Sequence, residues 1–519
     1  MSFGRRRFLV SSSLTAAGLA VPLASLWSRQ ARARDYGDLV PDIDGILDLP
    51  AGFSYTVLEE RSDPMDDGYV VPGRPDGMAC FEGPDDTWIL MRNHEVSAGD
   101  FSNGAYGVGQ APPEAYDANA YGGVTRVVID ATTLTRVSSN LVLTGTIRNC
   151  AGGPSPWGWL SCEENVSGDH GYVFACPIDA ATVVNPDRID GYGRYNHEAA
   201  AVDPATSICY LTEDRGDSAV YRFVPDDPAD PFTGTLQALR VMGQDGLDTS
   251  TGLSVGDTLA IDWVDITDPT PVNDTVRDEA QAAGAATFSR GEGIWFHDGE
   301  VFIACTNGGP AGLGQIFRLV DGPRSGGIEL IAQSEDSDVL DFPDNIAVAP
   351  WGQVFIAEDG DGDNYIRAIT DTGDVVSFAR NALSDSELAG VCFSPDGQAL
   401  FVNIQGDGLT LMVTGPFPTD PGGSDETGTG DEAGETDDPD GSGTGGGTAD
   451  GGTNGGATTG GEGSGGTAAG SGGSGGQDDQ DGEGCGCSTS DDPSAGLAVA
   501  AGALVVGLHA RRGPSQTED

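Results

Sequence analysis

The feature of this sequence that most constrains its fold is a strand pattern that returns along the chain. An apolar run ends in polar or acidic residues, passes a Gly/Asp turn and continues into a second run, as in VFIAEDGDGD followed by YIRAI. Such runs recur at intervals of roughly 50 residues after a longer first interval. They begin at Trp88, Trp159, Cys209, Leu259, Val301, Val354 and Leu400. Hairpins repeated in this way are typical of propeller blades. The sequence therefore predicts an all-β chain folded as a β-propeller of six or seven blades, with little helix.

The acidic ends of these runs predict where a functional site lies. In a propeller, corresponding strand ends meet at one mouth of the central channel. The residues at that place are Glu95, Glu163 or Glu164, Glu213 or Asp214, and Glu358 or Asp359. So many carboxylates in a small volume repel one another unless cations neutralise them. We therefore expect a metal cluster at the mouth.

The two ends of the chain predict export and surface display. Residues 1–33 contain Arg5, Arg6, Phe8 and Leu9 in a twin-arginine arrangement, followed by an apolar stretch and the small-x-small sequence Ala31-Arg32-Ala33. The twin-arginine translocase, which moves folded proteins, is thus an expected partner. The mature protein is expected in the periplasm or at the cell surface.

Composition divides the rest of the chain. Residues 34–415 read as one globular propeller, long enough for a large core. Residues 416–484 are rich in Gly, Ser, Thr and Asp and predict a disordered linker. Residues 485–519 combine a cysteine pair, a short apolar stretch and two arginines, and resemble the sorting tails of myxobacterial surface proteins. That resemblance implies sorting machinery and an outer-membrane anchor.

Charge excludes several classes of partner. The formal net charge is −56, from 81 acidic and 25 basic residues, and every basic residue is arginine. Such a field repels nucleic acid and anionic lipid, whereas carboxylates suit hard cations. The chain has nine cysteines, and setting aside Cys485 and Cys487 leaves seven, an odd number. At least one cysteine of the globular part is therefore a buried thiol or a metal ligand.

Several short motifs, taken in order, strongly resemble the PhoX family of alkaline phosphatases. The resemblance runs from about Asn93 to Gln405. The segments are Asn93-His94-Glu95, Asn149-Cys150-Ala151-Gly152-Gly153, Cys162-Glu163-Glu164, Asn196-His197-Glu198, Arg290-Gly291-Glu292-Gly293, Phe342-Pro343-Asp344-Asn345, AEDG and GVCFSPDGQALFVNIQ. The resemblance implies a monomeric propeller enzyme that hydrolyses phosphate monoesters with two ferric ions and two or three calcium ions.

This resemblance implies roles for individual residues. Cys150 is expected to bridge iron, because a thiolate is a soft ligand. The expected metal ligands are Glu95, Cys150, Glu163, Glu164, Glu198, Glu213, Asp214, Glu292, Asp344, Asn345 and Glu358. Strand alternation sends Glu163 and Glu164 to opposite faces, and the sequence does not decide between them. Arg290, and secondly Arg215, are expected to bind the phosphoryl group, since a guanidinium holds two oxygens at once.

Other residues keep simpler interpretations. His94 and His197 each precede a glutamate and are expected to hydrogen-bond to ligands, because the chain has only five histidines and none at H-x-x-x-H spacing. The run Asp359-Gly360-Asp361-Gly362-Asp363-Asn364 is either a calcium loop or a polar hairpin turn.

Two other functions remain open at this level. A calcium-dependent propeller hydrolase of lactonase type would hold calcium without iron. A non-enzymatic surface protein would use calcium for rigidity alone. Fold does not decide among these functions, because one architecture hosts many chemistries.

Overall fold

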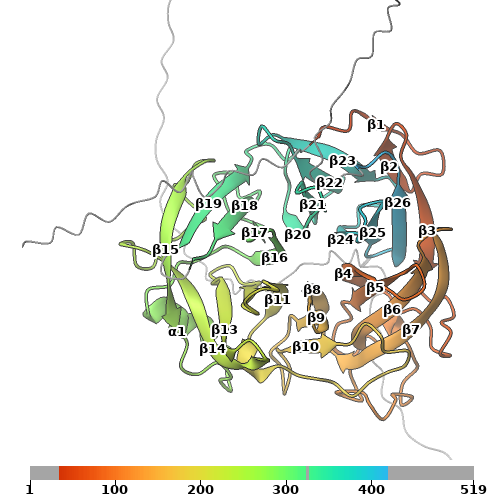
Figure 1. The fold of residues 1–519 in the computed structure, drawn as a ribbon, viewed down its shortest axis with the longest axis horizontal. Coiled ribbons are helices and arrows are strands. Elements are labelled where there is room, and N and C mark those ends of the chain that lie inside the picture. The colour runs from red at the N-terminus through yellow and green to blue at the C-terminus, as the bar shows by residue number, and fades with distance from the viewer. Residues whose placement is uncertain (1–33, 323–325, 419–519) are drawn as a thin grey trace, which may run out of the picture. The chain divides into compact units, whose positions relative to one another are not determined.

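The described residues of the computed structural model, 34–322 and 326–418, form β-sheets arranged around a common centre (Figure 1). The predicted export signal, nearly all of the predicted linker and the sorting tail lie outside the described residues.

Five sheets make up this arrangement within the described residues. One four-stranded sheet contains β4 (Pro75–Glu82), β5 (Thr87–His94), β6 (Gly122–Asp130) and β7 (Thr135–Thr146). A three-stranded sheet contains β8 (Asn149–Ser155), β9 (Gly158–Glu163) and β10 (Val173–Cys176). A nine-stranded sheet contains β11 (His197–Val202), β12 (Cys209–Glu213), β13 (Tyr221–Asp227), β14 (Asp230–Val241), β15 (Thr258–Asp265), β19 (Gly326–Gln333), β18 (Gln315–Val320), β17 (Glu300–Cys305) and β16 (Gly291–His297), in that spatial order.

The last two sheets recruit strands from the beginning of the described chain. A six-stranded sheet has the order β1 (Leu39–Val40), β2 (Leu47–Pro50), β23 (Val375–Asn381), β22 (Tyr365–Ile369), β21 (Val354–Glu358) and β20 (Pro343–Val348). The final sheet has the order β24 (Leu388–Phe393), β25 (Ala399–Ile404), β26 (Leu409–Thr414) and β3 (Ser54–Glu60). Antiparallel pairing of β3 with β26 and of β2 with β23 therefore joins the two ends of the folded region.

The innermost strands form a ring. Strands β4, β8, β11, β16, β20 and β24 each neighbour the next, and β24 neighbours β4, so the ring closes (Figure 1). The sheets radiate from these strands, which is the propeller-like, all-β arrangement that the repeated strands predict.

One of the repeated runs has a different place from the one that its sequence suggests. The run at Leu259 is β15, which lies between the outer strands β14 and β19 and links two groups of four strands into the nine-stranded sheet. It does not follow an inner strand. Alternating apolar residues fit an outer strand as well as an inner one, so periodicity alone could not distinguish the two.

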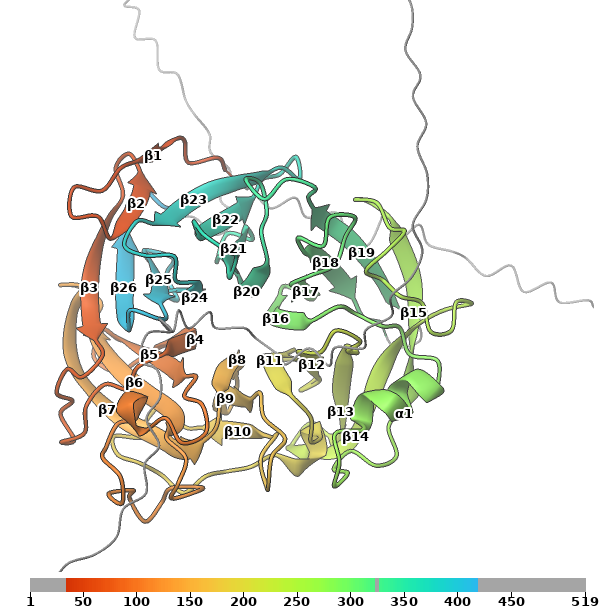
Figure 2. The same cartoon turned by 180° about the vertical axis from the view of Figure 1, so that it is seen from behind.

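Helix is scarce in the described residues. The α-helix α1 (Val276–Ala282) and the short 3-10 helices η2 (Phe101–Asn103) and η3 (Asp190–Tyr192) lie in connections. Figure 2 shows α1 beside β13 and β14, where Val276 and Ala280 are buried in the same apolar cluster as Leu236. None of the helices in the described residues combines the length and apolar character needed to cross a bilayer.

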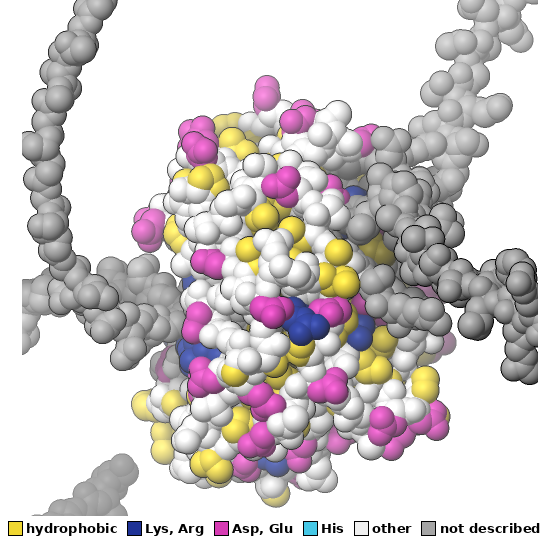
Figure 3. Space-filling view, turned by 90° about the vertical axis from the view of Figure 1, so that its left-hand side faces the viewer, with side chains coloured by type: hydrophobic (Ala, Val, Ile, Leu, Met, Phe, Trp, Pro, Cys, Tyr) yellow, Lys and Arg dark blue, Asp and Glu magenta, His cyan; other side chains and the backbone are white. Residues whose placement is uncertain are grey.

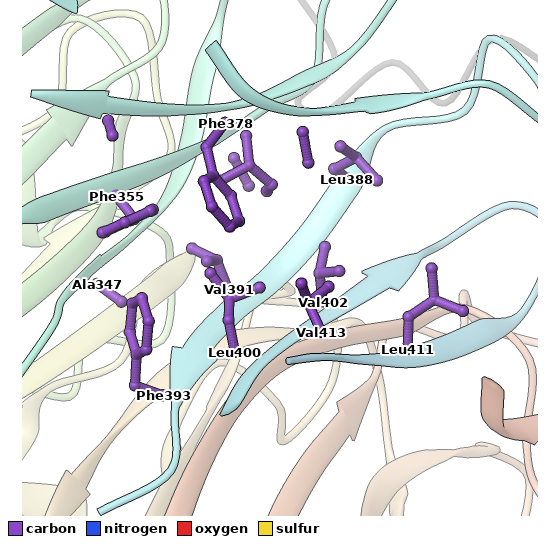
Figure 4. Close-up of a cluster of buried hydrophobic side chains, with 14 of the residues drawn as sticks. Ala347, Phe355, Phe378, Leu388, Val391, Phe393, Leu400, Val402, Leu411 and Val413 are labelled. Carbon is purple, nitrogen blue, oxygen red and sulfur yellow. The ribbon is translucent and has the colours of Figure 1, made fainter. Parts of the chain in front are cut away.

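The core consists of apolar layers between neighbouring sheets. Figure 4 shows one of them, in which Phe355 of β21 and Phe378 of β23 face Phe393 of β24 in the next sheet. The ring centroids of Phe355 and Phe393 are 4.9 Å apart and the rings meet edge to face. Because each sheet is covered on both faces, apolar runs such as VFIA are buried along their whole length.

The charge of the chain lies largely on its surface. Figure 3 shows one side of the folded region with aspartates and glutamates spread among neutral side chains and few arginines. Carboxylates near the starts of the inner strands, such as Glu198, Glu292 and Asp344, differ from these because they are buried.

Candidate metal centre

The inner strands share one irregularity near their first residues, a β-bulge in the pairing with the second strand. In the pairing of β4 with β5, Pro75 lies opposite His94 and the register shifts before Met78. The same shift occurs in the pairs that begin with β8, β11, β16, β20 and β24. A bulge breaks strict alternation and re-aims the side chain of its extra residue. The residues inside these bulges thus hold equivalent positions around the ring.

Almost all of these bulges contain a side chain that can bind a metal. The residue directly after the first pair is Asp76 in β4, Cys150 in β8, Glu198 in β11, Glu292 in β16, Asp344 in β20 and Ala389 in β24. In β24 this residue still pairs, with Asn403, and the shift follows it. In Glu198, Glu292 and Asp344, one carboxylate oxygen each lies within 4.8 Å of the others, and all three residues are buried. Within the described residues, this is the group of His, Cys, Asp and Glu side chains whose ligand atoms converge most clearly.

We call the candidate ligands near the starts of the inner strands, Asp76 included, the cluster. Some of its carboxylate oxygens accept no hydrogen bond. Asp76 Oδ1, Glu198 Oε2 and Glu292 Oε2 are buried without a partner. An unsatisfied buried carboxylate oxygen is costly, and a bound cation is the usual way to satisfy it. The donor set therefore fits metal ions.

The electrostatics of the cluster point the same way. Burial raises the pKa of Glu198 and of Glu292 well above ordinary values, and neighbouring carboxylates raise it further. Burial also raises the pKa of Asp344 to about 6. Burial therefore shifts these carboxyl groups toward the neutral form, whereas bound cations would favour the ionised form.

Cys150 lies in the same cluster. Its Sγ is 3.4 Å from the carbonyl oxygen of His197 and 3.6 Å from that of Glu198. Burial, followed by the nearby carboxylates of Glu198, Glu164 and Asp76, raises the pKa of this thiol well above its usual range. A thiol so placed becomes a thiolate only with a metal beside it, and it would then be the soft donor among oxygens.

A second layer of side chains follows the ends of the second strands. Glu95, Glu164, Asp214, Thr306, Asp359 and Gln405 each come directly after the residue that pairs with the start of the inner strand. This second layer contacts the first layer, which consists of the candidate ligands near the starts of the inner strands. Gln405 Nε2 donates to Asp76 Oδ2 (3.1 Å) and to Glu95 Oε2 (2.9 Å), and Thr306 Oγ1 donates to Glu292 Oε1 (2.9 Å).

The two predicted phosphoryl-binding arginines have different surroundings. Arg290 donates to Asp214 (2.8 and 3.1 Å) and to Glu292 (2.7 Å), so it joins the two layers. Arg215 donates to Asp274 at 3.4 and 3.2 Å. Their side chains are 18% and 24% exposed, so both reach solvent at the mouth.

Three of the expected ligands lie apart from this cluster. Glu163 accepts hydrogen bonds from Ile147 N (2.9 Å) and Gly171 N (3.0 Å), and its Oε1 lies 2.6 Å from His170 Nδ1. Glu213 accepts from Tyr221 Oη at 2.8 Å. Glu358 accepts from Arg367 Nε (2.8 Å) and Asp341 N (2.9 Å). Each of these glutamates directly precedes a second-layer residue in the sequence. Because successive side chains of a strand point to opposite faces, their carboxylates point away from the second layer. Of the pair Glu163 and Glu164, it is therefore Glu164 that belongs to the second layer.

Asn345 also has a supporting place rather than a ligating one. Its Nδ2 donates to Asp344 Oδ2 (2.8 Å), and its Oδ1 accepts from Gly390 N. Both ends of the amide are thus engaged, and they hold Asp344 in place.

His94 and His197 were expected to hydrogen-bond to metal ligands, but the hydrogen bonds found for them have other partners. His94 lies 3.0 Å from Gly73 O and 2.8 Å from Thr125 Oγ1. His197 lies 3.0 Å from Gly193 O, and its ring stacks on Tyr195 at 3.7 Å. Both rings are fully buried, and these contacts are with residues outside the cluster.

The acidic loop after β21 acts in part as a hairpin turn. Asn364 accepts from Gly360 N (2.6 Å), and Asp363 accepts from Arg380 (3.0 Å). Asp359 belongs instead to the second layer, and burial raises its pKa to about 8.

Asp76 is a member of the cluster that the sequence analysis missed. A signal was present, because Pro75-Asp76-Gly77 repeats the pattern of Pro343-Asp344-Asn345 at the start of an inner strand. Unlike Glu198, Glu292 and Asp344, however, Asp76 belongs to none of the motifs that carry the family resemblance, which begins at about Asn93.

A small cavity lies next to the candidate ligands. Its lining includes Gly77, Ala151, Ala199, Gly293, Asn345, Gly390 and Trp295, and several of these residues directly follow a candidate ligand in the sequence. Trp295 packs against apolar clusters of several sheets. Small and apolar residues thus make up most of this lining.

Comparison with known proteins found a matching family and similar solved structures. The family model "Alkaline phosphatase PhoX" matches residues 34–141 and 135–408. Among solved structures, PhoX of Pseudomonas fluorescens in complex with vanadate, a transition state analogue, shares 18% identity, and the match covers 75% of this chain and 98% of that chain with a TM-score of 0.56. A gluconolactonase of Xanthomonas campestris shares 13% identity over 74% of this chain and 99% of that chain, with a TM-score of 0.39. No curated protein matches.

The first structure shows the propeller-like fold, and the family model spans nearly all of the described residues. This chain belongs to the PhoX family of alkaline phosphatases.

Proposed function

We propose that this protein hydrolyses phosphate monoesters at a cluster of iron and calcium ions in the mouth of the propeller. The observation that carries this proposal is the recurrence of a ligand at the same bulge of successive inner strands. Glu198, Glu292 and Asp344 converge within 4.8 Å, and two of them carry unpartnered buried oxygens. Membership of the PhoX family supports the reaction type.

The proposed ligands divide by chemistry. Cys150 with its neighbours Glu198, Glu292 and Asp344 would hold two ferric ions, because the thiolate selects iron over calcium. Asp76, Glu95, Glu164, Asp214 and Asp359 would hold two or three calcium ions, which prefer carboxylate oxygens. Glu163, Glu213, Glu358 and Asn345 leave this set, because hydrogen bonds within the protein already use their oxygens.

When bound, the ions would neutralise phosphoryl charge, supply an oxygen nucleophile and stabilise the departing alkoxide. The chain itself would orient the substrate. Arg290 lies beside Glu292 and Asp214, where its planar fork can hold two phosphoryl oxygens. Arg215, held by Asp274, would contribute a second positive charge. Buried surroundings make both charges more effective than they would be in water.

The architecture proposed for this function is a monomer of six blades, one for each strand of the inner ring. We further propose that residues 1–33 direct export by the twin-arginine translocase. Residues 485–519 would engage sorting machinery that holds the protein at the cell surface, with residues 416–484 as a spacer.

Elemental analysis and an assay with p-nitrophenyl phosphate test the central claim on the full-length protein. We expect bound iron and calcium, and loss of hydrolysis after chelation that returns when both metals return. Calcium without iron, together with lactone hydrolysis, would favour the lactonase interpretation. A folded, metal-loaded protein that hydrolyses neither ester would favour a non-enzymatic surface role.

A further inference from the structure

Arginines occupy the same position before three of the inner strands. Arg74 directly precedes β4, Arg148 precedes β8, and Arg290 precedes β16. All three have left-handed backbone, with φ of 50°, 52° and 51°. Arg74 donates to the amide oxygen of Gln405 (3.4 Å), whereas Arg148 and Arg290 donate to carboxylates. The carbonyl oxygen of Arg148 accepts from Glu164 N (2.9 Å), and that of Arg290 accepts from Thr306 N (3.0 Å). Left-handed backbone is uncommon outside glycine, so the fold holds these residues in one specific geometry.

The side chains of Arg148 and Arg290 are also placed alike. Arg290 bridges Glu292 and the second-layer residue Asp214. Arg148 donates to the second-layer residue Glu95 through Nε (3.0 Å) and forms an ion pair with Glu164. Both guanidinium groups are partly exposed, by 19% for Arg148 and 18% for Arg290. Each therefore stands between buried carboxylates and the solvent of the mouth.

Their position relative to the candidate ligands completes the equivalence. Arg148 is two residues before Cys150, just as Arg290 is two residues before Glu292. The backbone N–H of Arg148 donates to Val96 O, and that of Arg290 donates to Arg215 O, each on the connection after a second strand. Arg148 therefore shares the geometry on which the proposed substrate contact of Arg290 rests.

We infer that Arg148 binds oxygens of the phosphoryl group jointly with Arg290, an inference that rests on the proposed function. A phosphate dianion offers several acceptors, and two planar forks from different strands can hold it better than one. The chain has no lysine, so any positive side chain at the mouth must be arginine. Cations bound by Glu95 and Glu164 would draw these carboxylates away from Arg148, and phosphoryl oxygens would replace them as acceptors.

A purely structural role for Arg148 makes a different prediction. If the residue only neutralises Glu95 and Glu164, its loss would lower stability or metal content, and variant protein reloaded to the metal content of the wild type would bind phosphate with unchanged affinity. The two roles are therefore separated by measuring affinity for inorganic phosphate on samples of equal metal content.

The experiment uses the metal-loaded, full-length protein and titrates it with inorganic phosphate by calorimetry. Because a charged hydrogen bond contributes about 1.5–3 kcal/mol, we expect Arg148→Gln to weaken phosphate binding roughly 10- to 100-fold. Arg148→Lys keeps the charge without the fork and should fall between this variant and the wild type. Arg240→Gln is the matched control, since Arg240 pairs with Asp262 between the outer strands β14 and β15 and should leave binding unchanged.

Each result bears on the inference. Phosphate affinity within twofold of the wild type in Arg148→Gln, at equal metal content, would overturn it. Affinity lost equally in Arg148→Gln and Arg240→Gln would overturn it as well, because the effect would then be one of general charge. A wild-type protein that binds phosphate but does not hydrolyse monoesters would contradict the proposed function, and the titration would still decide the role of Arg148.

Discussion

At the scale of single residues, the mouth depends on which side chains the inner strands present. Four carboxylates and one thiol directly follow the first pair of five inner strands, and Ala389 holds this position in the sixth, β24. Their chemistry is complementary, because carboxylate oxygens suit calcium while a thiolate suits iron. Changing one atom at Cys150 should therefore change which metal stays bound.

Replacing Cys150 with serine tests this choice. The hydroxyl is a harder and weaker donor than a thiolate, so we expect bound iron to fall at least severalfold while calcium is largely kept. Elemental analysis of the purified variant measures both metals. Cys176→Ser is a suitable control, since Cys176 is a buried thiol of β10 outside the cluster. Iron content equal to wild type in Cys150→Ser would remove this residue from the ligand set.

Replacing Arg290 with alanine tests the phosphoryl-binding role. Loss of a charged bidentate contact should lower kcat/KM about 10- to 1,000-fold with a smaller change in metal content. Kinetics with p-nitrophenyl phosphate, set beside elemental analysis of the same sample, provide the measurement. Unchanged kinetics would exclude Arg290 from the reaction.

His170 predicts a pH dependence of stability. Burial lowers the pKa of His170, but the hydrogen bond that it donates to Glu163 and the charges of Glu163 and Asp117 outweigh this effect, so the pKa lies above its ordinary value. A pKa raised in the folded state stabilises the fold below about pH 6.5, and this contribution is lost as pH rises through the folded value. Relative to His170→Gln, the wild type should therefore lose unfolding free energy as pH rises above about 6.5. Urea unfolding at several pH values measures the difference, and parallel profiles for the two proteins would contradict the assignment.

At the scale of elements, the inner strands bring the ligands together by approaching one another closely. A Cβ added at Gly293 of β16 would lie 2.6 Å from Ile346 N and 2.7 Å from Asp344 O, both on β20. These are backbone atoms of the neighbouring inner strand and cannot move aside. Glycine beside Glu292 is therefore a condition for packing Asp344 next to it.

Gly293→Ala tests this requirement. We expect it to lower the free energy of unfolding by about 2 kcal/mol or more and to release metal, because the two inner strands must separate. Gly107→Ala is the matched control, since its nearest neighbour is Gln110 Oε1 at 3.4 Å and a small change is expected. Thermal unfolding with metal analysis measures both effects. Equal stability of the two variants would show that the ring can widen without cost.

At the scale of the whole folded region, the ring must be closed for the mouth to exist. The side chains of Arg92 and Glu59 are each 1% exposed and form an ion pair at 2.7 Å. Arg92 lies on β5 of the first complete sheet, and Glu59 lies on β3, which completes the last one. Arg92 also donates to Thr410 of β26 at 2.7 Å. This network joins strands from the beginning and the end of the described chain.

Removing one partner of this pair should open the closure. Glu59→Gln leaves the guanidinium of Arg92 buried beside a neutral group, and we expect a loss of about 3–5 kcal/mol in the free energy of unfolding. Asp262→Asn removes the exposed pair with Arg240, whose side chains are 32% exposed, and should cost less than about 1 kcal/mol. Chemical unfolding of both variants measures the contrast, and similar losses in the two would refute the role of the buried pair in closure.

The sequence by itself determined the class of fold, and it named Cys150, Glu198, Glu292 and Asp344 as candidate ligands. Repeated apolar runs require sheets covered on both faces, and motifs such as Arg290-Gly291-Glu292-Gly293 place candidate ligand types at strand starts. Only the tertiary structure placed Glu164 and not Glu163 in the second layer, added Asp76 to the candidates and located the run at Leu259 on an outer strand. It also gave Arg148 the same backbone geometry as Arg290. The physical reason is that periodicity records which side chains are buried, whereas bulges, strand order and ring closure decide which buried side chains meet. Those features arise from contacts between residues far apart in the chain, and no local pattern contains them.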